Sequence, residues 1–152
     1  MKVGIIGGGR VGSRLAASSR EAGVLVGITA ASEQHSAQLA QQFGVPATDN
    51  AKLWQAADVL LLTVPDRLIG TVAEELAQSV TPAAKVVLHV SGSVGLEPLA
   101  PLAQLGAHVG TLHPLQSFAG GNTKLAGVYM ALDGDSEAQD AGKKLVELFG
   151  GK

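Results

Sequence analysis

Three glycines near the start of the chain have the spacing of a loop that binds phosphate. They form the pattern Gly-x-Gly-x-x-Gly at Gly7, Gly9 and Gly12, between the apolar run of residues 3–6 and a helical pattern. The first glycine permits a tight turn, the second lets the backbone approach a pyrophosphate, and the third lets the helix pack closely on a strand. The first helical amides, at Arg10 and Val11, have no partners within the helix and lie at its positive end. The sequence therefore predicts a dinucleotide-binding loop.

The end of the second apolar run should carry the group that contacts the adenosine ribose, about 20 residues after the glycines. That window reads Thr-Ala-Ala-Ser-Glu at residues 29–33, with no acid at the strand end to accept the ribose hydroxyls. We therefore expect NADP in preference to NAD, with Ser32 and Arg10 reaching the 2′-phosphate. In an alternative interpretation, Ser32 is a helix N-cap and Glu33 complements the helix dipole. A Glu33 side chain that points at the ribose would favour NAD.

The third apolar run ends in Leu-Leu-Thr-Val-Pro-Asp at residues 61–66. Pro65 has no amide hydrogen, so sheet pairing should stop there. Thr63, Val64 and Pro65 are then predicted to form a wall beside the cofactor ribose. Asp66 is predicted to cap the helix that follows, in preference to a role in the site.

Two further segments should open onto the same site. One carries Ser91 and Ser93 in His-Val-Ser-Gly-Ser, and the other carries His113 after an apolar run. An imidazole titrates near neutrality, so His113 could move the proton that accompanies hydride transfer, while either serine orients the substrate oxygen. The alternative is that His113 is a packed structural group. His89 lies inside its strand and is predicted to be packed.

The four histidines predict no metal site, because they show no ligand spacing and no paired carboxylates. They are His35, His89, His108 and His113.

Apolar runs alternate with helical patterns along the whole chain. The runs are residues 3–6, 24–29, 59–64, 86–90, 107–112 and 128–132, and the helical patterns are residues 10–22, 33–43, 67–79 and 136–149, with short pieces at 50–55 and 96–105. This order predicts one α/β domain over residues 1–152, with a doubly wound, mostly parallel sheet in three α/β/α layers. Ligands of such sheets bind at the carboxyl ends of the strands.

The composition of the chain excludes several classes of partner and of chemistry. The net charge is −2 without a basic cluster, which argues against nucleic acid, and no apolar run has the length of a membrane span. There is no cysteine, so thiolate chemistry and disulfides are excluded. We expect a cytoplasmic protein with a small-molecule substrate.

These motifs together resemble a known family pattern. Gly-Gly-Gly-Arg-Val-Gly at 7–12, Ala-Asp through Val-Pro-Asp at 57–66, His-Val-Ser-Gly at 89–92 and Leu-His-Pro-Leu-Gln-Ser-Phe at 112–118 resemble the Rossmann-like N-terminal domain of NADP-dependent oxidoreductases. That family is related to 6-phosphogluconate dehydrogenase, prephenate dehydrogenase, pyrroline-5-carboxylate reductase and deazaflavin-dependent NADP reductases. The resemblance implies that His113 faces the substrate beside the nicotinamide, next to Ser91 or Ser93. It also implies a helical C-terminal domain, absent from these residues, that contacts the substrate and forms a homodimer.

The sequence thus predicts the NAD(P)-binding domain of an oxidoreductase, which is not a complete enzyme by itself. Two other functions use the same loop: a dinucleotide-binding or sensing module without catalysis, and a binder of phosphosugars or nucleotides.

Overall fold

Six strands form one sheet in a computed structural model that describes residues 1–116 and 124–152. The order across the sheet is β2-β1-β3-β4-β5-β6. The strands β1 to β5 run parallel to one another, and β6 is antiparallel to β5. The strands are β1 (Val3–Ile6), β2 (Leu25–Thr29), β3 (Val59–Leu62), β4 (Val86–His89), β5 (His108–Pro114) and β6 (Met130–Gly134).

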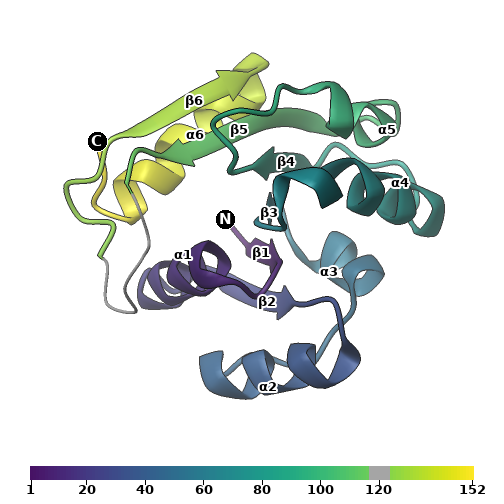
Figure 1. Ribbon diagram of the computed structural model, residues 1–152, viewed down its shortest axis with the longest axis horizontal. Helices are drawn as coiled ribbons and strands as arrows, with labels where there is room; N and C mark the ends of the chain where they lie inside the picture. The colour runs from purple at the N-terminus through teal and green to yellow at the C-terminus, as the bar shows by residue number, and fades with distance from the viewer. Residues whose placement is uncertain (117–123) are drawn as a thin grey trace.

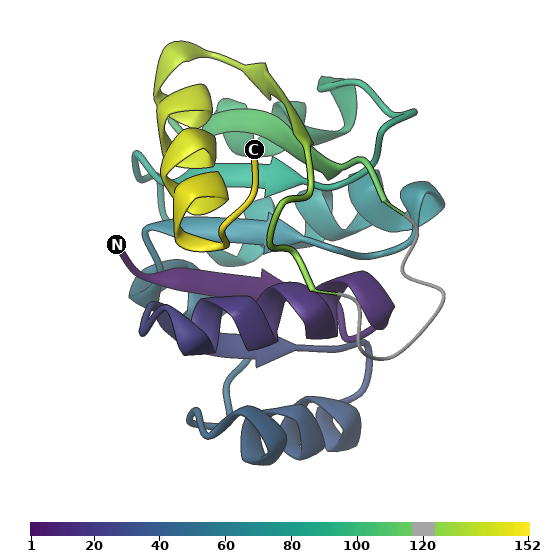
Figure 2. The same ribbon diagram turned by 90° about the vertical axis from the view of Figure 1, so that its left-hand side faces the viewer.

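Helices cover both faces of the sheet, as the alternating sequence pattern predicted. They are α1 (Arg10–Glu21), α2 (Glu33–Phe43), α3 (Asn50–Ala56), α4 (Ile69–Ser79), α5 (Ala100–Ala103) and α6 (Ser136–Leu148), with short 3₁₀ turns η1 (Asp66–Leu68) and η2 (Glu97–Leu99). Figure 1 shows the strands between the two groups of helices, and in Figure 2 α1 and α6 lie on the face nearest the viewer. The prediction of a three-layer, doubly wound α/β fold is confirmed.

The two faces of the sheet bury separate apolar clusters because side chains alternate along each strand. In β3, Leu61 packs with Leu15 of α1 and Leu145 of α6, whereas Leu60 packs with Trp54 of α3 on the opposite face. Residues 59–62 are all buried, as expected for a central parallel strand covered on both sides. Each fully buried leucine stabilises the fold by roughly 1.5–3 kcal/mol relative to an exposed one.

Helix α3 lies unusually close to the sheet. Its Leu53 side chain packs over Gly4 and Gly27, which are register partners on β1 and β2. A Cβ atom at either glycine would lie 2.7 Å from a carbon of Leu53. The absence of side chains on these two glycines therefore sets how closely α3 approaches β2.

Two boundaries differ from the sequence prediction in a way that matters for the site. β5 extends through His113 and Pro114, because β6 pairs with these residues from outside the parallel set. The helix expected over residues 67–79 begins instead as the 3₁₀ turn η1, and α4 starts at Ile69. None of the helices within the described residues is long and apolar enough to cross a membrane.

Candidate active site at the carboxyl edge of the sheet

The glycine loop connects β1 to α1 and is held by β3. Gly7 has a φ of 122°, a conformation that favours glycine. The Thr63 hydroxyl, at the end of β3, lies 2.8 Å from the carbonyl oxygen of Gly7 and donates to it. A Cβ atom at Gly12 would overlap that same carbonyl group. The first and third glycines of the motif thus allow the close packing that the sequence predicted.

The middle glycine is different, because its missing side chain leaves open space. Gly9 is the N-cap of α1, with an ordinary φ of −76°. A Cβ atom built there meets no atom of the described chain within 4 Å. The first amides of α1 therefore face an open cradle at the positive end of a 12-residue helix. This is the geometry that an incoming pyrophosphate requires.

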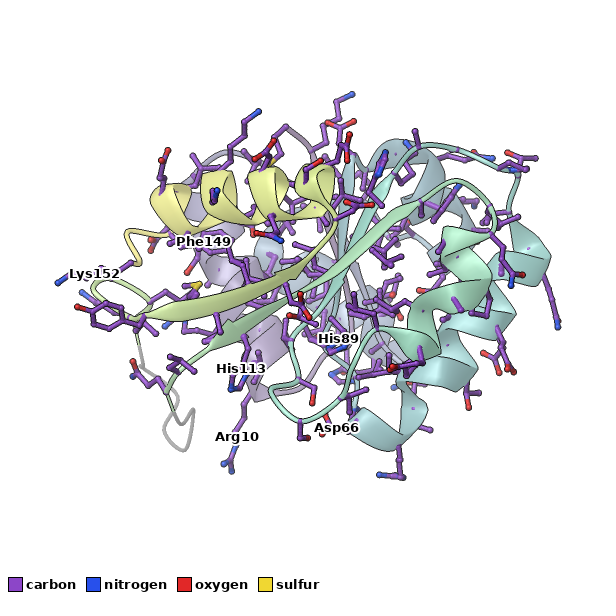
Figure 3. The ribbon with its side chains drawn as sticks, turned by 90° about the horizontal axis from the view of Figure 1, so that it is seen from above. Arg10, Asp66, His89, His113, Phe149 and Lys152 are labelled. Atoms are coloured by element: carbon purple, nitrogen blue, oxygen red, sulfur yellow. The ribbon has the colours of Figure 1, made fainter. Side chains whose placement is uncertain are left out.

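A cleft of about 720 Å³ lies beside this loop and brings together most of the predicted site residues. It is lined by Arg10, Val11, Thr63, Val64, Pro65, Asp66, Val90, Ser91, Gly92, Ser93 and His113. Figure 3 shows Arg10, Asp66 and His113 at one edge of the molecule. These residues come from the ends of β1, β3, β4 and β5, where ligands of parallel sheets bind. Ser117 and Phe118 of the His-Pro motif lie outside the described residues.

His113 is half-buried in the cleft wall and its ring orientation is fixed. Its Nδ1 atom lies 2.9 Å from the carbonyl oxygen of Val90. A carbonyl oxygen only accepts hydrogen bonds, so Nδ1 carries the proton and Nε2 of the neutral ring is an acceptor. A Cβ atom at Gly92 would overlap Nε2, so the imidazole lies against the backbone of the serine loop. His113 is thus placed to take a proton at Nε2, or to donate one when protonated.

Ser91 and Ser93 form a small hydroxyl network with Asp66. The two Oγ atoms are 3.3 Å apart, and the Ser93 amide donates to Ser91 Oγ at 3.2 Å. Ser93 Oγ donates to Asp66 Oδ2 at 3.0 Å. The prediction that the Asp66 side chain caps the following helix is therefore wrong. Its carboxylate instead anchors the serine loop across the cleft, a contact between residues 27 positions apart that no local pattern reveals.

His89 is packed, as predicted, with no exposed surface. Its Nδ1 atom accepts from the Ser91 amide at 3.1 Å, and its Nε2 atom lies 2.8 Å from the carbonyl oxygen of Gly95. His89 thus contacts both ends of the serine loop.

A second pocket, of about 640 Å³, lies at the end of β2. It is lined by Thr29, Ala30, Glu33, Ser36, Ala37, Ala47, Thr48, Asp49, Asn50 and Lys52. Thr29 donates its hydroxyl hydrogen to Asn50 Oδ1, which joins β2 to the start of α3. Sequence reasoning found Glu33 here but missed Asn50 and Lys52, which follow an irregular connection after α2.

The two residues that were expected to contact a 2′-phosphate have different surroundings in the structure. Ser32 Oγ accepts from the His35 amide at 3.1 Å, so the N-cap interpretation is confirmed. Arg10 lines the cleft that contains His113. The cation that lines the β2 pocket is Lys52, whose Nζ atom is 4.0 Å from a carboxylate oxygen of Asp49.

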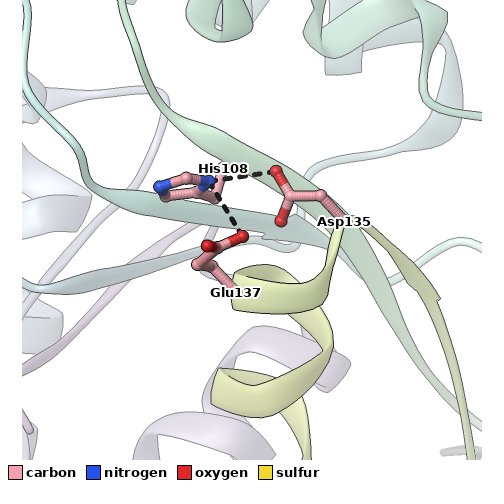
Figure 4. Close-up of side chains that lie close together, drawn as sticks. All are labelled: His108, Asp135 and Glu137. Atoms are coloured by element: carbon pink, nitrogen blue, oxygen red, sulfur yellow. Dashed lines mark hydrogen bonds and ion pairs between the residues drawn. The ribbon is translucent and has the colours of Figure 1, made fainter.

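His108 meets two carboxylates at the amino end of β5, far along that strand from His113. Its Nδ1 atom is 3.0 Å from Asp135 Oδ2 and 3.6 Å from Glu137 Oε2 (Figure 4). Such a group has the donor atoms of a metal site, although sequence spacing predicted none. Asp135 also caps α6, since its Oδ1 accepts from the Ala138 amide at 2.9 Å. The contacts therefore join the start of α6 to β5.

A glycine turn between the first strand and helix of a doubly wound, mostly parallel sheet is typical of Rossmann-like folds. Residues 1–114 match the family model described as a Rossmann-like domain, and the chain belongs to that family. No curated protein sequence matches the chain.

Solved structures share the fold over nearly the whole chain. They include arogenate dehydrogenase from Synechocystis (24% identity, TM-score 0.81, covering 100% of this chain and 58% of that one). The chain is also similar to 1-pyrroline-5-carboxylate reductase from Streptococcus pyogenes (22% identity, TM-score 0.76, covering 99% of this chain and 56% of that one). A third similar structure is prephenate dehydrogenase from A. aeolicus (20% identity, TM-score 0.76, covering 100% of this chain and 58% of that one). The chain thus spans little more than half the length of these structures.

Proposed function

We propose that this chain is the NAD(P)-binding domain of an oxidoreductase that acts on a small carbonyl, imine or hydroxy substrate. The observation that carries the proposal is the arrangement of one continuous cleft. The start of α1 lies at one side of the cleft, next to the open space at Gly9. The Nε2 side of His113 lies at the other side of the cleft. A dinucleotide laid along this edge places its phosphates on the helix amides and its nicotinamide near the histidine.

The residues present fit such a cofactor. The amides of Arg10 and Val11 would hold the pyrophosphate, and Thr63, Val64 and Pro65 would flank the nicotinamide ribose. When bound, the nicotinamide supplies hydride transfer. His113 takes or gives the accompanying proton at Nε2, and Ser91 or Ser93 donates a hydrogen bond to the substrate oxygen or nitrogen. The Asp66 carboxylate holds Ser93 in place for that contact.

For the cofactor we propose NADP in preference to NAD. No acid stands at the end of β2, where it would repel a 2′-phosphate, and the positive end of α2 borders the β2 pocket. Lys52 supports the proposal as the cation lining this pocket, and Glu33 opposes it. We expect NADPH to bind about fivefold more tightly than NADH, which corresponds to about 1 kcal/mol.

We also propose that the substrate site is completed by a further helical domain, which would dimerise, and that the enzyme works in the cytoplasm. The solved neighbours support the further domain, because each of those chains extends well beyond the part that matches. Isolated residues 1–152 should accordingly bind cofactor but show little turnover, because one wall that orients the reactant and excludes water is missing.

Calorimetry with NADPH and NADH tests the cofactor site directly, with a phosphosugar as competitor. Turnover is then tested in the longest natural chain that contains these residues. The panel is arogenate, prephenate, 1-pyrroline-5-carboxylate and a cyclic imine, which are substrates or ligands suggested by the neighbours' names. Absence of binding to either dinucleotide would contradict the proposal. Dinucleotide binding by the longest natural chain with no turnover of any substrate would favour the sensing module.

A further inference from the structure

One peptide group lies between the two histidines of the site. The Val90 carbonyl oxygen accepts from His113 Nδ1 at 2.9 Å, and the Ser91 amide donates to His89 Nδ1 at 3.1 Å. That carbonyl and that amide belong to the same peptide unit. On the far side, His89 Nε2 is 2.8 Å from the carbonyl oxygen of Gly95. Three hydrogen bonds therefore connect the cleft to the far end of the serine loop.

The chemistry of the partners fixes the direction of every bond in this chain. An amide N–H only donates, so Nδ1 of His89 is unprotonated and its Nε2 donates to Gly95. A carbonyl oxygen only accepts, so Nδ1 of His113 carries its proton. Donors and acceptors thus run head to tail from His113 to Gly95. Hydrogen bonds aligned in this way polarise and strengthen one another.

Burial makes His89 hard to replace in this chain. Its side chain is completely buried, so an apolar side chain in its place leaves the Ser91 amide facing apolar atoms instead of an acceptor. An unpaired amide in this place would favour rotation or displacement of the Val90–Ser91 peptide. The carbonyl group that orients His113 would move with it, because the two groups share one rigid plane.

We propose that His89 is a positioning residue that acts through the Val90–Ser91 peptide. It keeps His113 in the tautomer whose Nε2 accepts a proton in the cleft. The role in catalysis rests on the proposed function, but the effect on the tautomer does not. The two histidines are thereby held in opposite tautomers, His113 with its proton on Nδ1 and His89 with its proton on Nε2.

Long-range ¹H–¹⁵N spectra of the labelled chain test this first without any substitution. At about pH 8, where an ordinary imidazole is neutral, the nitrogen shifts identify which ring atom carries the proton. We expect the Nδ1–H form for His113 and the Nε2–H form for His89. Either histidine in the other tautomer overturns the proposal.

Two variants then separate positioning from simple packing. His89→Asn retains an acceptor where Nδ1 stood and should leave His113 in the Nδ1–H form. His89→Leu removes both contacts and should convert His113 to a mixture with the Nε2–H form. The control is His108→Asn, which removes a hydrogen-bonded histidine outside the cleft and should leave the His113 signals unchanged. An unchanged His113 in folded His89→Leu overturns the proposal; if this variant does not fold, His89→Phe, which keeps a planar ring but removes both nitrogen atoms, is measured in its place with the same two outcomes.

Calorimetry with NADPH on the same wild-type sample keeps the two proposals apart. The expected tautomers without dinucleotide binding would contradict the proposed function and leave the positioning role intact. Dinucleotide binding together with the opposite tautomers would contradict the positioning role and leave the proposed function intact.

Discussion

The two pockets at the carboxyl edge of the sheet are built on different principles. In the His113 cleft, hydrogen bonds hold the imidazole and the serine hydroxyls: Val90 orients His113, and Asp66 holds Ser93. In the β2 pocket, charges of both signs lie on exposed side chains, namely Glu33, Asp49 and Lys52. The first arrangement fixes the orientation of a titratable ring and two hydroxyl groups, whereas the charges of Glu33 and Lys52 in the second can be removed without loss of a helix cap. The glycine loop lies between the two pockets, so a substitution in this loop should affect binding in both.

The strongest test of this contrast removes the imidazole of the cleft. His113→Ala should lower turnover of the full-length enzyme by roughly 10² to 10⁴, the usual contribution of a positioned acid or base. NADPH affinity should barely change, because the histidine lies on the substrate side. Steady-state kinetics and calorimetry on the same preparation measure both quantities. Unaltered turnover in His113→Ala would show that this residue has a structural role and no part in catalysis.

The shared loop is tested at its open glycine. Gly9→Val should lower NADPH affinity at least 100-fold, because the side chain fills the space that the pyrophosphate requires. The melting temperature should stay close to wild type, since that space is empty and the φ at Gly9 is ordinary. Gly12→Ala is the contrast: its Cβ overlaps the Gly7 carbonyl, so it should lower the melting temperature. Full NADPH affinity in Gly9→Val would exclude this cradle as the phosphate site.

A smaller effect is expected where β3 holds the loop. Thr63→Val removes the hydroxyl that donates to Gly7 with little change of shape. The free energy of unfolding should fall by about 1 kcal/mol, because a carbonyl group loses its hydrogen bond. Urea denaturation measures this loss, and a fall in NADPH affinity should accompany it. Wild-type stability would show that the loop holds its shape without β3.

The smallest effects should come from the exposed charges of the β2 pocket. Lys52→Gln should weaken NADPH about twofold to threefold and leave NADH unchanged, since surface charge pairs contribute little in water. Glu33→Gln should strengthen NADPH to a similar degree. Calorimetry with both dinucleotides gives the ratio for each variant. A wild-type preference for NADH that Glu33→Gln abolishes would show that Glu33 binds the ribose and that the cofactor is NAD.

The sequence was most informative where local patterns carry the structure. Alternating apolar runs located all six strands, and the glycine spacing located the loop, because both depend on neighbours along the chain. Contacts between distant segments were not accessible in this way. Nothing near Asp66 indicates that Ser93 will reach it, and the extension of β5 through His113 depends on pairing with β6. His89 was correctly predicted to be packed, but its link to His113 through a peptide group appears only in three dimensions.

The two glycines beneath Leu53 let α3 lie close enough to β2 for a hydrogen bond between them. Leu53 packs on both glycines, and Asn50 at the start of the same helix accepts from Thr29 at the rim of the β2 pocket. A methyl group at Gly27 would meet Leu53, push α3 outward and strain the Thr29–Asn50 hydrogen bond without changing any charge. The lining of the β2 pocket can therefore be reshaped by a substitution inside the core, without a change to any charged side chain of that pocket.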